Sequence, residues 1–180
     1  YTTHLTGLSG RKLLIPKSWK NPTGKFRLGL KRGYDLFPSR LIPRVRAERK
    51  AKWQKNQARL SARIASKIRL AKLGGRLIGT KASRLKELND QLAMVSKMTY
   101  RDPGPVFDCV VFHDGRSWQA AVDTDEDGNF GDEKLMTDYR KKRQYASFGS
   151  SIMLNFALNI YNNGNLLSIV TDCGVHGTHV

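Results

Sequence analysis

The stretch NLLSIVTDCGVHGTHV, residues 165–180, decides the fold class that the sequence predicts. Its apolar half, NLLSIV, is typical of a strand, and glycines at 174 and 177 favour a tight turn after it. His176 then stands where a helix would begin, and His179 follows three residues later. Because the positive end of a helix dipole opposes protonation of an imidazole, we expect His176 to be neutral near pH 7 and able to act as a general base.

Length and composition indicate a folded chain. Its 180 residues are enough for one domain with a core, and 39% apolar and 9% aromatic residues argue against wholesale disorder. No run of about 18 apolar residues occurs, so the sequence predicts no membrane-spanning helix. Two cysteines, Cys109 and Cys173, are too few for a disulfide framework and are typical of a reducing compartment.

The formal net charge of +17 is concentrated in one segment. Residues 40–101 contain 18 Lys and Arg but only three acids, whereas the rest of the chain has 14 Lys and Arg against 12 acids. The basic character therefore belongs to that segment and not to the fold as a whole.

Residues 43–73 and 81–98 are expected to be helices. The apolar positions in the first recur on one helical face: Trp53, Leu60, Ile64, Ile68 and Ala71. In the second, Leu85, Leu88, Leu92 and Val95 have three-four spacing. Two glycines at 74–75 end the first helix, which predicts a helical hairpin.

The flanking segments are expected to form strands. Turn residues interrupt short apolar pieces in residues 1–39, which predicts strands and loops packed on a neighbouring core. Beyond Pro105, VFDCVVF, HDGR and SWQAAVD predict a hairpin, with Asp114-Gly115 as a type I′ turn candidate. MLNFALNIY and NLLSIVTD predict a second hairpin around NNG, and part of the stretch between the two hairpins is expected to be helical.

Several stretches carry a resemblance to a known family. HGTHV, 176–180, is similar to the histidine box of the subtilisin-like serine peptidases. Four further stretches resemble one family of these peptidases, the tripeptidyl-peptidase II family. They are GLSGRKLLIPKSWKNPTGKFRLGLKRGYDLFP, DPGPVFDCVVFHDGRSWQAAVDTDEDGNF, YASFG and NIYNNGNLLSIVTDCGVHGTHV. The resemblance spans the chain and is weakest through the basic helices.

The resemblance implies an α/β fold. Its core would be a partial subtilisin-like parallel-sheet domain, carrying a mixed α+β insertion that contains the basic helical hairpin. The implied divisions are 1–42, strands and loops at the start of the insertion; 43–101, the hairpin; 102–163, the α+β part; and 164–180, the strand and histidine-box start of the catalytic core.

The resemblance also implies a function, with His176 as the catalytic general base and His179 as a packed structural residue. Neither the Asp-Thr/Ser-Gly turn nor the Gly-Thr-Ser-Met-Ala stretch of the family occurs here, so the catalytic Asp is expected before Tyr1 and the Ser after Val180. The chain would be an inactive piece of a cytoplasmic exopeptidase that releases tripeptides from free N-termini of oligopeptides. The whole enzyme would form large homo-oligomers and need no cofactor.

Two other chemistries near the histidines are less favoured. Cys173 lies three residues before His176, but closeness in sequence is not the spatial pairing that a Cys–His nucleophile needs. A metal pair at 176 and 179 lacks the adjacent Glu and the i, i+4 spacing of a zinc-binding helix. The sequence therefore predicts no metal ligand there.

The acidic stretch DTDEDGNFGDEK, 123–134, resembles a calcium-binding EF-hand loop only in part. Asp123, Asp125 and Asp127 occupy its first, third and fifth positions, but the twelfth is Lys134 instead of a bidentate Glu. We interpret it as an acidic turn after a strand, with weak calcium binding as the alternative.

The basic helices admit two alternatives to a purely structural role. Their charge would attract nucleic-acid phosphates, and Trp53 could stack on a base, yet this residue lies on the apolar stripe and no nucleic-acid-binding motif accompanies it. The second alternative is a module that joins subunits. A solvated face, or a surface that contacts an acidic neighbour, is the interpretation we favour.

Overall fold

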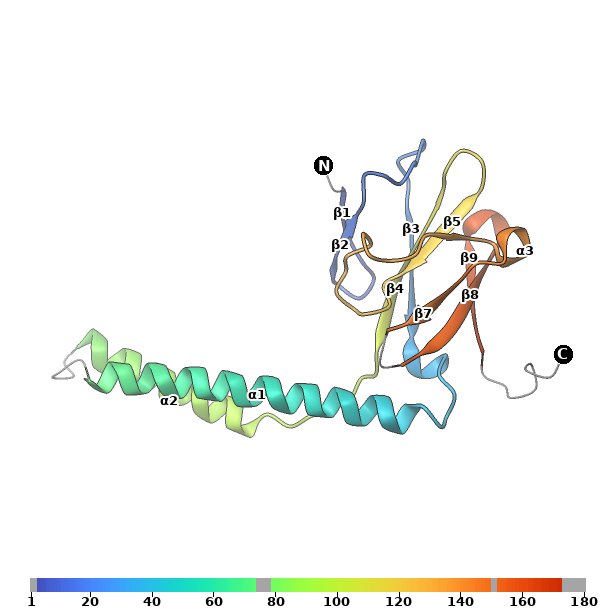
Figure 1. The fold of residues 1–180 in the computed structure, drawn as a ribbon. Helices are drawn as coiled ribbons and strands as arrows, with labels where there is room; N and C mark the ends of the chain where they lie inside the picture. Colours follow the sequence, from blue (N-terminus) through green and yellow to red (C-terminus); the bar gives the residue numbers. More distant parts are fainter. Residues whose placement is uncertain (1–2, 74–78, 150–151, 173–180) are drawn as a thin grey trace. The chain divides into compact units, whose positions relative to one another are not determined.

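The computed structural model describes residues 3–73, 79–149 and 152–172 (Figure 1). The chain divides into two compact units: a strand unit, Tyr1–Ile42 with Gly104–Val180, and a helical unit, Pro43–Pro103. The fold is thus a mixed α/β one, as expected in its coarse class. None of the helices among the described residues is long and apolar enough to cross a membrane.

A four-stranded antiparallel sheet forms the centre of the strand unit. It consists of β3 (Arg27–Arg32), β4 (Val106–His113), β5 (Trp118–Val122) and β6 (Met136–Thr137), in that order. The six residues inside β4, FDCVVF, are all buried, because both faces of this central strand are covered. That explains why its sequence is a continuous apolar run broken only by Asp108.

One face of this sheet packs against a small hairpin. The hairpin pairs β1 (Thr3–Thr6) with β2 (Lys12–Ile15). A core cluster of six buried residues lies between this hairpin and the central sheet: Leu13, Ile15, Val110, Phe112, Ala121 and Phe130. Trp19 covers this cluster, with its ring stacked at 5.4 Å from that of Phe112.

The other face packs against a three-stranded sheet of β7 (Tyr145–Phe148), β8 (Leu154–Tyr161) and β9 (Leu166–Thr171). Phenylalanine rings join the two sheets. The ring centroid of Phe148 lies 4.7 Å from that of Phe107 and 4.4 Å from that of Phe156. Figure 1 shows the central sheet between the β1–β2 hairpin and this second sheet. A short helix, α3 (Tyr139–Lys142), precedes β7, and two 3-10 turns are η1 (Gly33–Asp35) and η2 (Asn162–Gly164).

The helical unit consists of α1 (Ile42–Leu73) and α2 (Thr80–Lys97), which confirms the two expected helices. Ile64 and Ile68 of α1 form a buried cluster with Leu88 of α2, and the other three predicted α2 residues pack around it: Leu85, Leu92 and Val95. Leu60, on the same apolar stripe of α1, is 42% exposed.

The turn between β4 and β5 differs from the predicted type I′ turn. Asp114 and Ser117 are bridged by the Asp114 N–H, which donates to the Ser117 carbonyl at 3.0 Å. The central residues are therefore Gly115 and Arg116, and only the glycine has a positive φ, of 96°. A type I′ turn needs positive φ at both central positions, so Asp114-Gly115 does not form one.

The named strands among the described residues all pair antiparallel. This includes β9, which forms a hairpin with β8. The subtilisin-like parallel sheet that the resemblance implied lies outside these pairings and stays a prediction.

Candidate functional site

The strand that leads to the predicted catalytic histidine is anchored at its end. The Thr171 hydroxyl donates to the carbonyl of Leu36 at 3.0 Å, and the Asp172 N–H donates to the carbonyl of Asn155 at 3.2 Å. The structure thus fixes the chain up to four residues before His176. His176 itself, with His179 and Cys173, lies outside the described residues, so their predicted roles are not tested.

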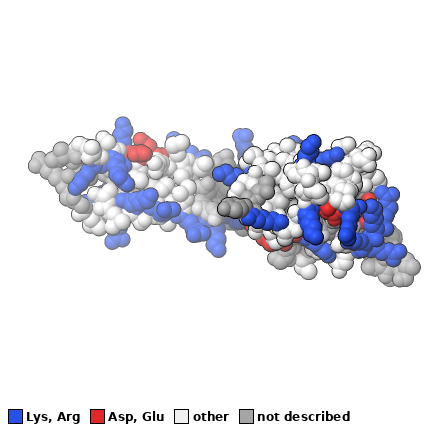
Figure 2. Space-filling view, turned by 90° about the horizontal axis from the view of Figure 1, so that it is seen from above, with Lys and Arg blue, Asp and Glu red and all other residues white. Residues whose placement is uncertain are grey.

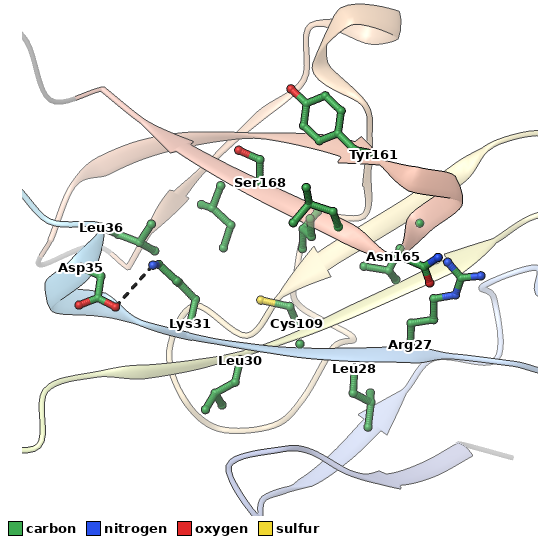
Figure 3. Close-up of a pocket in the computed structure, with 16 residues that line it drawn as sticks. Arg27, Leu28, Leu30, Lys31, Asp35, Leu36, Cys109, Tyr161, Asn165 and Ser168 are labelled. Carbon is green, nitrogen blue, oxygen red and sulfur yellow. Dashed lines mark hydrogen bonds and ion pairs between the residues drawn. The ribbon is translucent and has the colours of Figure 1, made fainter.

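A cleft of about 850 Å³ lies between β3 and β9 (Figure 3). Arg27 and Lys31 lie toward its two ends and Cys109 lies between them, while Leu28 and Leu30 point away from it. Lys31 is paired with Asp35 at 3.4 Å, and the Arg27 guanidinium lies over the Trp118 ring, 4.5 Å from its centroid. Both cations of the cleft are therefore already engaged with the protein.

The thiol in this cleft is not a nucleophile. Cys109 is 3% exposed, and burial, with the negative charges of Asp108 and Asp123, raises its pKa to about 12. A thiol with such a pKa stays protonated at neutral pH, and the thiolate is the reactive form. The cleft therefore offers no cysteine chemistry.

The three aspartates of the acidic loop do come together. Oxygen atoms of Asp123, Asp125 and Asp127 all lie within 4.8 Å of one another, close enough for one cation. Asp123 is buried and the other two are exposed. The Asp127 N–H donates to the carboxylates of Asp123 and Asp125, at 3.1 and 3.2 Å. Carboxylate oxygens are suitable calcium ligands, but this loop already has protein donors for them.

The second half of the loop departs from an EF-hand. Lys134, at the twelfth position, donates to the carbonyl of Tyr145 at 2.7 Å. The neighbouring carboxylate, that of Glu133, accepts hydrogen bonds from the N–H and the hydroxyl of Thr124, the latter at 2.8 Å. Burial raises the pKa of Glu133 to about 7 in spite of these bonds. The residues that would complete calcium coordination are therefore used to hold the loop itself.

Sequence reasoning missed the cation that pairs with the buried carboxylates of this region. Arg11, from the β1–β2 turn, donates to Asp108 at 2.9 Å, to Asp123 at 3.1 Å and to Glu126 at 3.3 Å. The indication in the sequence was Asp108 itself, since a carboxylate inside a buried apolar strand needs a charged partner. Nothing in the sequence identified which of the 32 cations would supply it.

The helical unit carries its charge on the surface and its tryptophan inside. Trp53 is partly buried, with its ring 5.5 Å from that of Tyr100, so packing accounts for it without a stacked base. Figure 2 shows Lys and Arg side chains along the exposed part of the hairpin, where acidic ones are sparse. The geometry therefore leaves a basic surface on the helical unit, whose described residues include no exposed aromatic ring on which a base could stack.

The chain is similar along nearly its whole length to proteins named tripeptidyl-peptidase 2. It is 38% identical over 187 residues to that of Arabidopsis thaliana, 39% over 186 residues to that of Oryza sativa subsp. japonica, and 31% over 185 residues to that of Caenorhabditis elegans. Each alignment covers 98% of this chain. The chain spans only 13–14% of the length of these curated relatives.

A solved structure is also similar, the crystal structure of tripeptidyl peptidase 2 (TPP II). It aligns with 59% of this chain and with 9% of its own chain, at 23% identity and a TM-score of 0.38. No protein-family model matches the chain.

Proposed function

Because the chain belongs to the tripeptidyl-peptidase 2 family, we propose that it is a segment of a serine exopeptidase that releases tripeptides from free N-termini of oligopeptides. The observation that carries the proposal is the alignment of 98% of the chain with relatives of that name. Since the chain spans 13–14% of their length, the activity belongs to a larger polypeptide.

In this proposal His176 is the general base of the triad. It takes the proton from the hydroxyl of the nucleophilic serine as that oxygen attacks the peptide carbonyl, and later gives the proton to the leaving amine. A helix that begins at His176 would keep the imidazole neutral between turnovers. The support for this assignment is the position in sequence of the glycine-flanked histidine, five residues after the last residue of strand β9, Thr171.

The remainder of the chain is then an insertion between the catalytic Asp and His. The strand unit and the helical unit would be that insertion, and β9 would begin the parallel sheet of a subtilisin-like core. One observation supports this: β9 is an edge strand in the sheet order β7-β8-β9 of the described residues. Among the described residues no strand pairs with its second edge, and in this proposal a parallel strand from another part of the polypeptide pairs there.

The proposal includes three further properties of the enzyme. Residues 1–180 contain one triad member and neither the Asp-Thr/Ser-Gly nor the Gly-Thr-Ser-Met-Ala stretch, so by themselves they are inactive. The full-length protein is cytoplasmic and assembles into a large homo-oligomer. It needs no cofactor, because a serine triad transfers the acyl group and proton with its own side chains.

The experiment uses the full-length protein of which this chain is a segment. A fluorogenic tripeptide amide is supplied with either a free or an acetylated N-terminus, and the protein is separately treated with a fluorophosphonate that labels activated serines. We expect the protein to hydrolyse only the substrate with a free N-terminus, and to lose this activity when the fluorophosphonate has labelled it. Equal hydrolysis of both forms, or turnover that labelling leaves intact, would overturn the proposal.

The chain of 180 residues is the matched control. It should neither hydrolyse the substrate nor react with the fluorophosphonate above the level of a denatured sample. Turnover that stays with the chain through purification would show that the triad assignment is wrong.

A further inference from the structure

The basic residues near the start of α1 have acidic partners. Arg46 and Arg49 both lie 3.3 Å from the carboxylate of Asp102, and Arg44 lies 3.8 Å from that of Glu48. These three cations thus have carboxylate partners within the helical unit. Further along the same helix the pattern is different.

Five basic residues on α1 form what we call the α1 row: Lys52, Lys55, Arg59, Arg63 and Lys67. Their spacings of three, four, four and four place them along one side of the helix, over about 22 Å. All five side chains are exposed, and in the described part of the chain none is paired with a carboxylate. Since like charges at i, i+4 destabilise a helix, the row works against the helix that carries it.

Exposed leucines lie beside the α1 row. Leu60 is 42% exposed and lines a shallow depression together with Arg59 and Arg63. Leu70, 68% exposed, lies seven residues after Arg63 and so on the same side of the helix. This face therefore offers a partner both cations that have no carboxylate partner among the described residues and apolar side chains that it can cover.

We propose that the α1 row is a docking surface for an acidic protein segment whose carboxylates flank an apolar side chain. Such a segment would pair its carboxylates with Arg59 and Arg63 and cover Leu60 in the depression between them. The charge of the row selects an acidic partner, and the leucine selects one with an apolar residue at its centre. A partner helix with carboxylates at every fourth residue would match the spacing of the row.

A nucleic acid fits the same charges less well. Phosphates would satisfy the cations but leave Leu60 and Leu70 exposed, and the one tryptophan of the helical unit packs on Tyr100. Binding of single strands normally adds stacking of bases on exposed aromatic rings. The combination of cations and leucines therefore favours a protein segment.

The test measures binding of defined probes to the chain of residues 1–180 by fluorescence anisotropy, at about 0.15 M salt. The first probe is a labelled helical peptide with Glu at every fourth position and a single Leu one turn from the central Glu. The second has Gln in place of each Glu. The third is a labelled single-stranded 20-nucleotide DNA of mixed sequence.

Two variants of equal charge change distinguish the row from net charge. Arg59→Glu with Arg63→Glu reverses the centre of the row, and Lys50→Glu with Arg69→Glu reverses two exposed cations of α1 that lie outside it. The double reversal places opposite charges at i, i+4 to Lys55 and to Lys67 and leaves one like-charged pair, between 59 and 63, so on balance it does not weaken the helix. Far-UV circular dichroism checks this for each variant.

We expect the Glu peptide to bind more tightly than the Gln peptide and the DNA. Reversal within the row should weaken that binding by about tenfold or more, against about threefold or less for the control pair. Leu60→Ala should also weaken it, whereas Met94→Ala, at an exposed residue of α2, should not. Equal losses in both charge variants, or tighter binding of the DNA than of the Glu peptide, would overturn the proposal.

Discussion

The guanidinium of Arg11 lies 2.9 Å from the carboxylate of Asp108, a residue 97 positions away that is completely buried. The same guanidinium also reaches Asp123, the first aspartate of the acidic loop, at 3.1 Å. Arg11 therefore connects the β1–β2 hairpin to the central sheet and to the acidic loop. A single guanidinium thus pairs with two buried carboxylates.

Arg11→Ala should destabilise the strand unit strongly, because it leaves Asp108 and Asp123 buried without a cation. Removing one partner of a buried ion pair costs about 3–5 kcal/mol in free energy of unfolding. Arg11 is partly exposed, so we expect the lower end of that range. Urea unfolding followed by tryptophan fluorescence measures it, with Lys20→Ala, at an exposed lysine, as the control.

Adding Asp108→Asn to Arg11→Ala should recover part of the loss, since the second change removes one of the uncompensated charges. If the double variant is less stable than Arg11→Ala by the full cost of Asp108→Asn alone, the two residues do not interact energetically and this view of the ion pair is wrong.

Glu133 should make the strand unit less stable as the pH rises toward neutrality. Burial raises its pKa from 4.5 to about 7 in the folded chain. Between these values the folded chain holds a proton that the unfolded chain has released, so the free energy of unfolding falls as the pH increases through the window. The favourable contribution is complete below pH 4.5 and lost above pH 7.

Glu133→Gln should remove that part of the pH dependence, because the amide keeps the shape of the protonated carboxyl and does not titrate. Urea unfolding of both proteins at several pH values between 4.5 and 7.5 gives the difference, and Asp132→Asn serves as the exposed neighbouring control. A carbon-13 shift of the Glu133 carboxyl that titrates near 4.5 would contradict the prediction directly.

The stability of the packing between α1 and α2 should depend on Ile64 and not on Leu60. Ile64 is 6% exposed and packs near Leu88, so Ile64→Ala should cost the helical unit about 2–4 kcal/mol. Leu60→Ala, at a residue 42% exposed, should change its stability by about 0.5 kcal/mol or less. Thermal unfolding followed by helical circular dichroism compares the two variants. Equal losses of stability would show that Leu60 contributes to the packing between α1 and α2.

Local patterns were sufficient to predict most elements of the fold. The two helices, the β4–β5 hairpin and the β8–β9 hairpin all occur where apolar periodicity and turn residues indicated them. These features depend on neighbours in sequence, which is why sequence reasoning reaches them. Leu60 shows the limit: it fits the helical period, but α2 covers the adjacent side of α1, which only the packing of the two helices decides.

Contacts distant in sequence were not predictable in the same way. The ion pairs of Arg11 join residues 97 to 115 positions apart, and the bond from Thr171 to Leu36 spans 135. The acidic loop shows the same limit, because its aspartates were found from their spacing but the bonds from Thr124 to Glu133 were not. Which partner a polar group finds depends on topology, and topology is not written in local spacing.

We propose that His176, and not His179, is the general base of the full-length enzyme. The measurement is kcat and melting temperature of His176→Ala and His179→Ala side by side, with the tripeptide amide as substrate. His176→Ala should lower kcat by about 10⁴-fold or more at an unchanged melting temperature, since a triad acts as a unit.

His179→Ala should instead lower the melting temperature through a lost buried hydrogen bond, with activity falling only as far as stability does. The pH profile of the unmutated enzyme should show a basic group that titrates near or below about 6.5. If His176→Ala remains active while His179→Ala abolishes turnover without loss of stability, the catalytic histidine has been wrongly assigned.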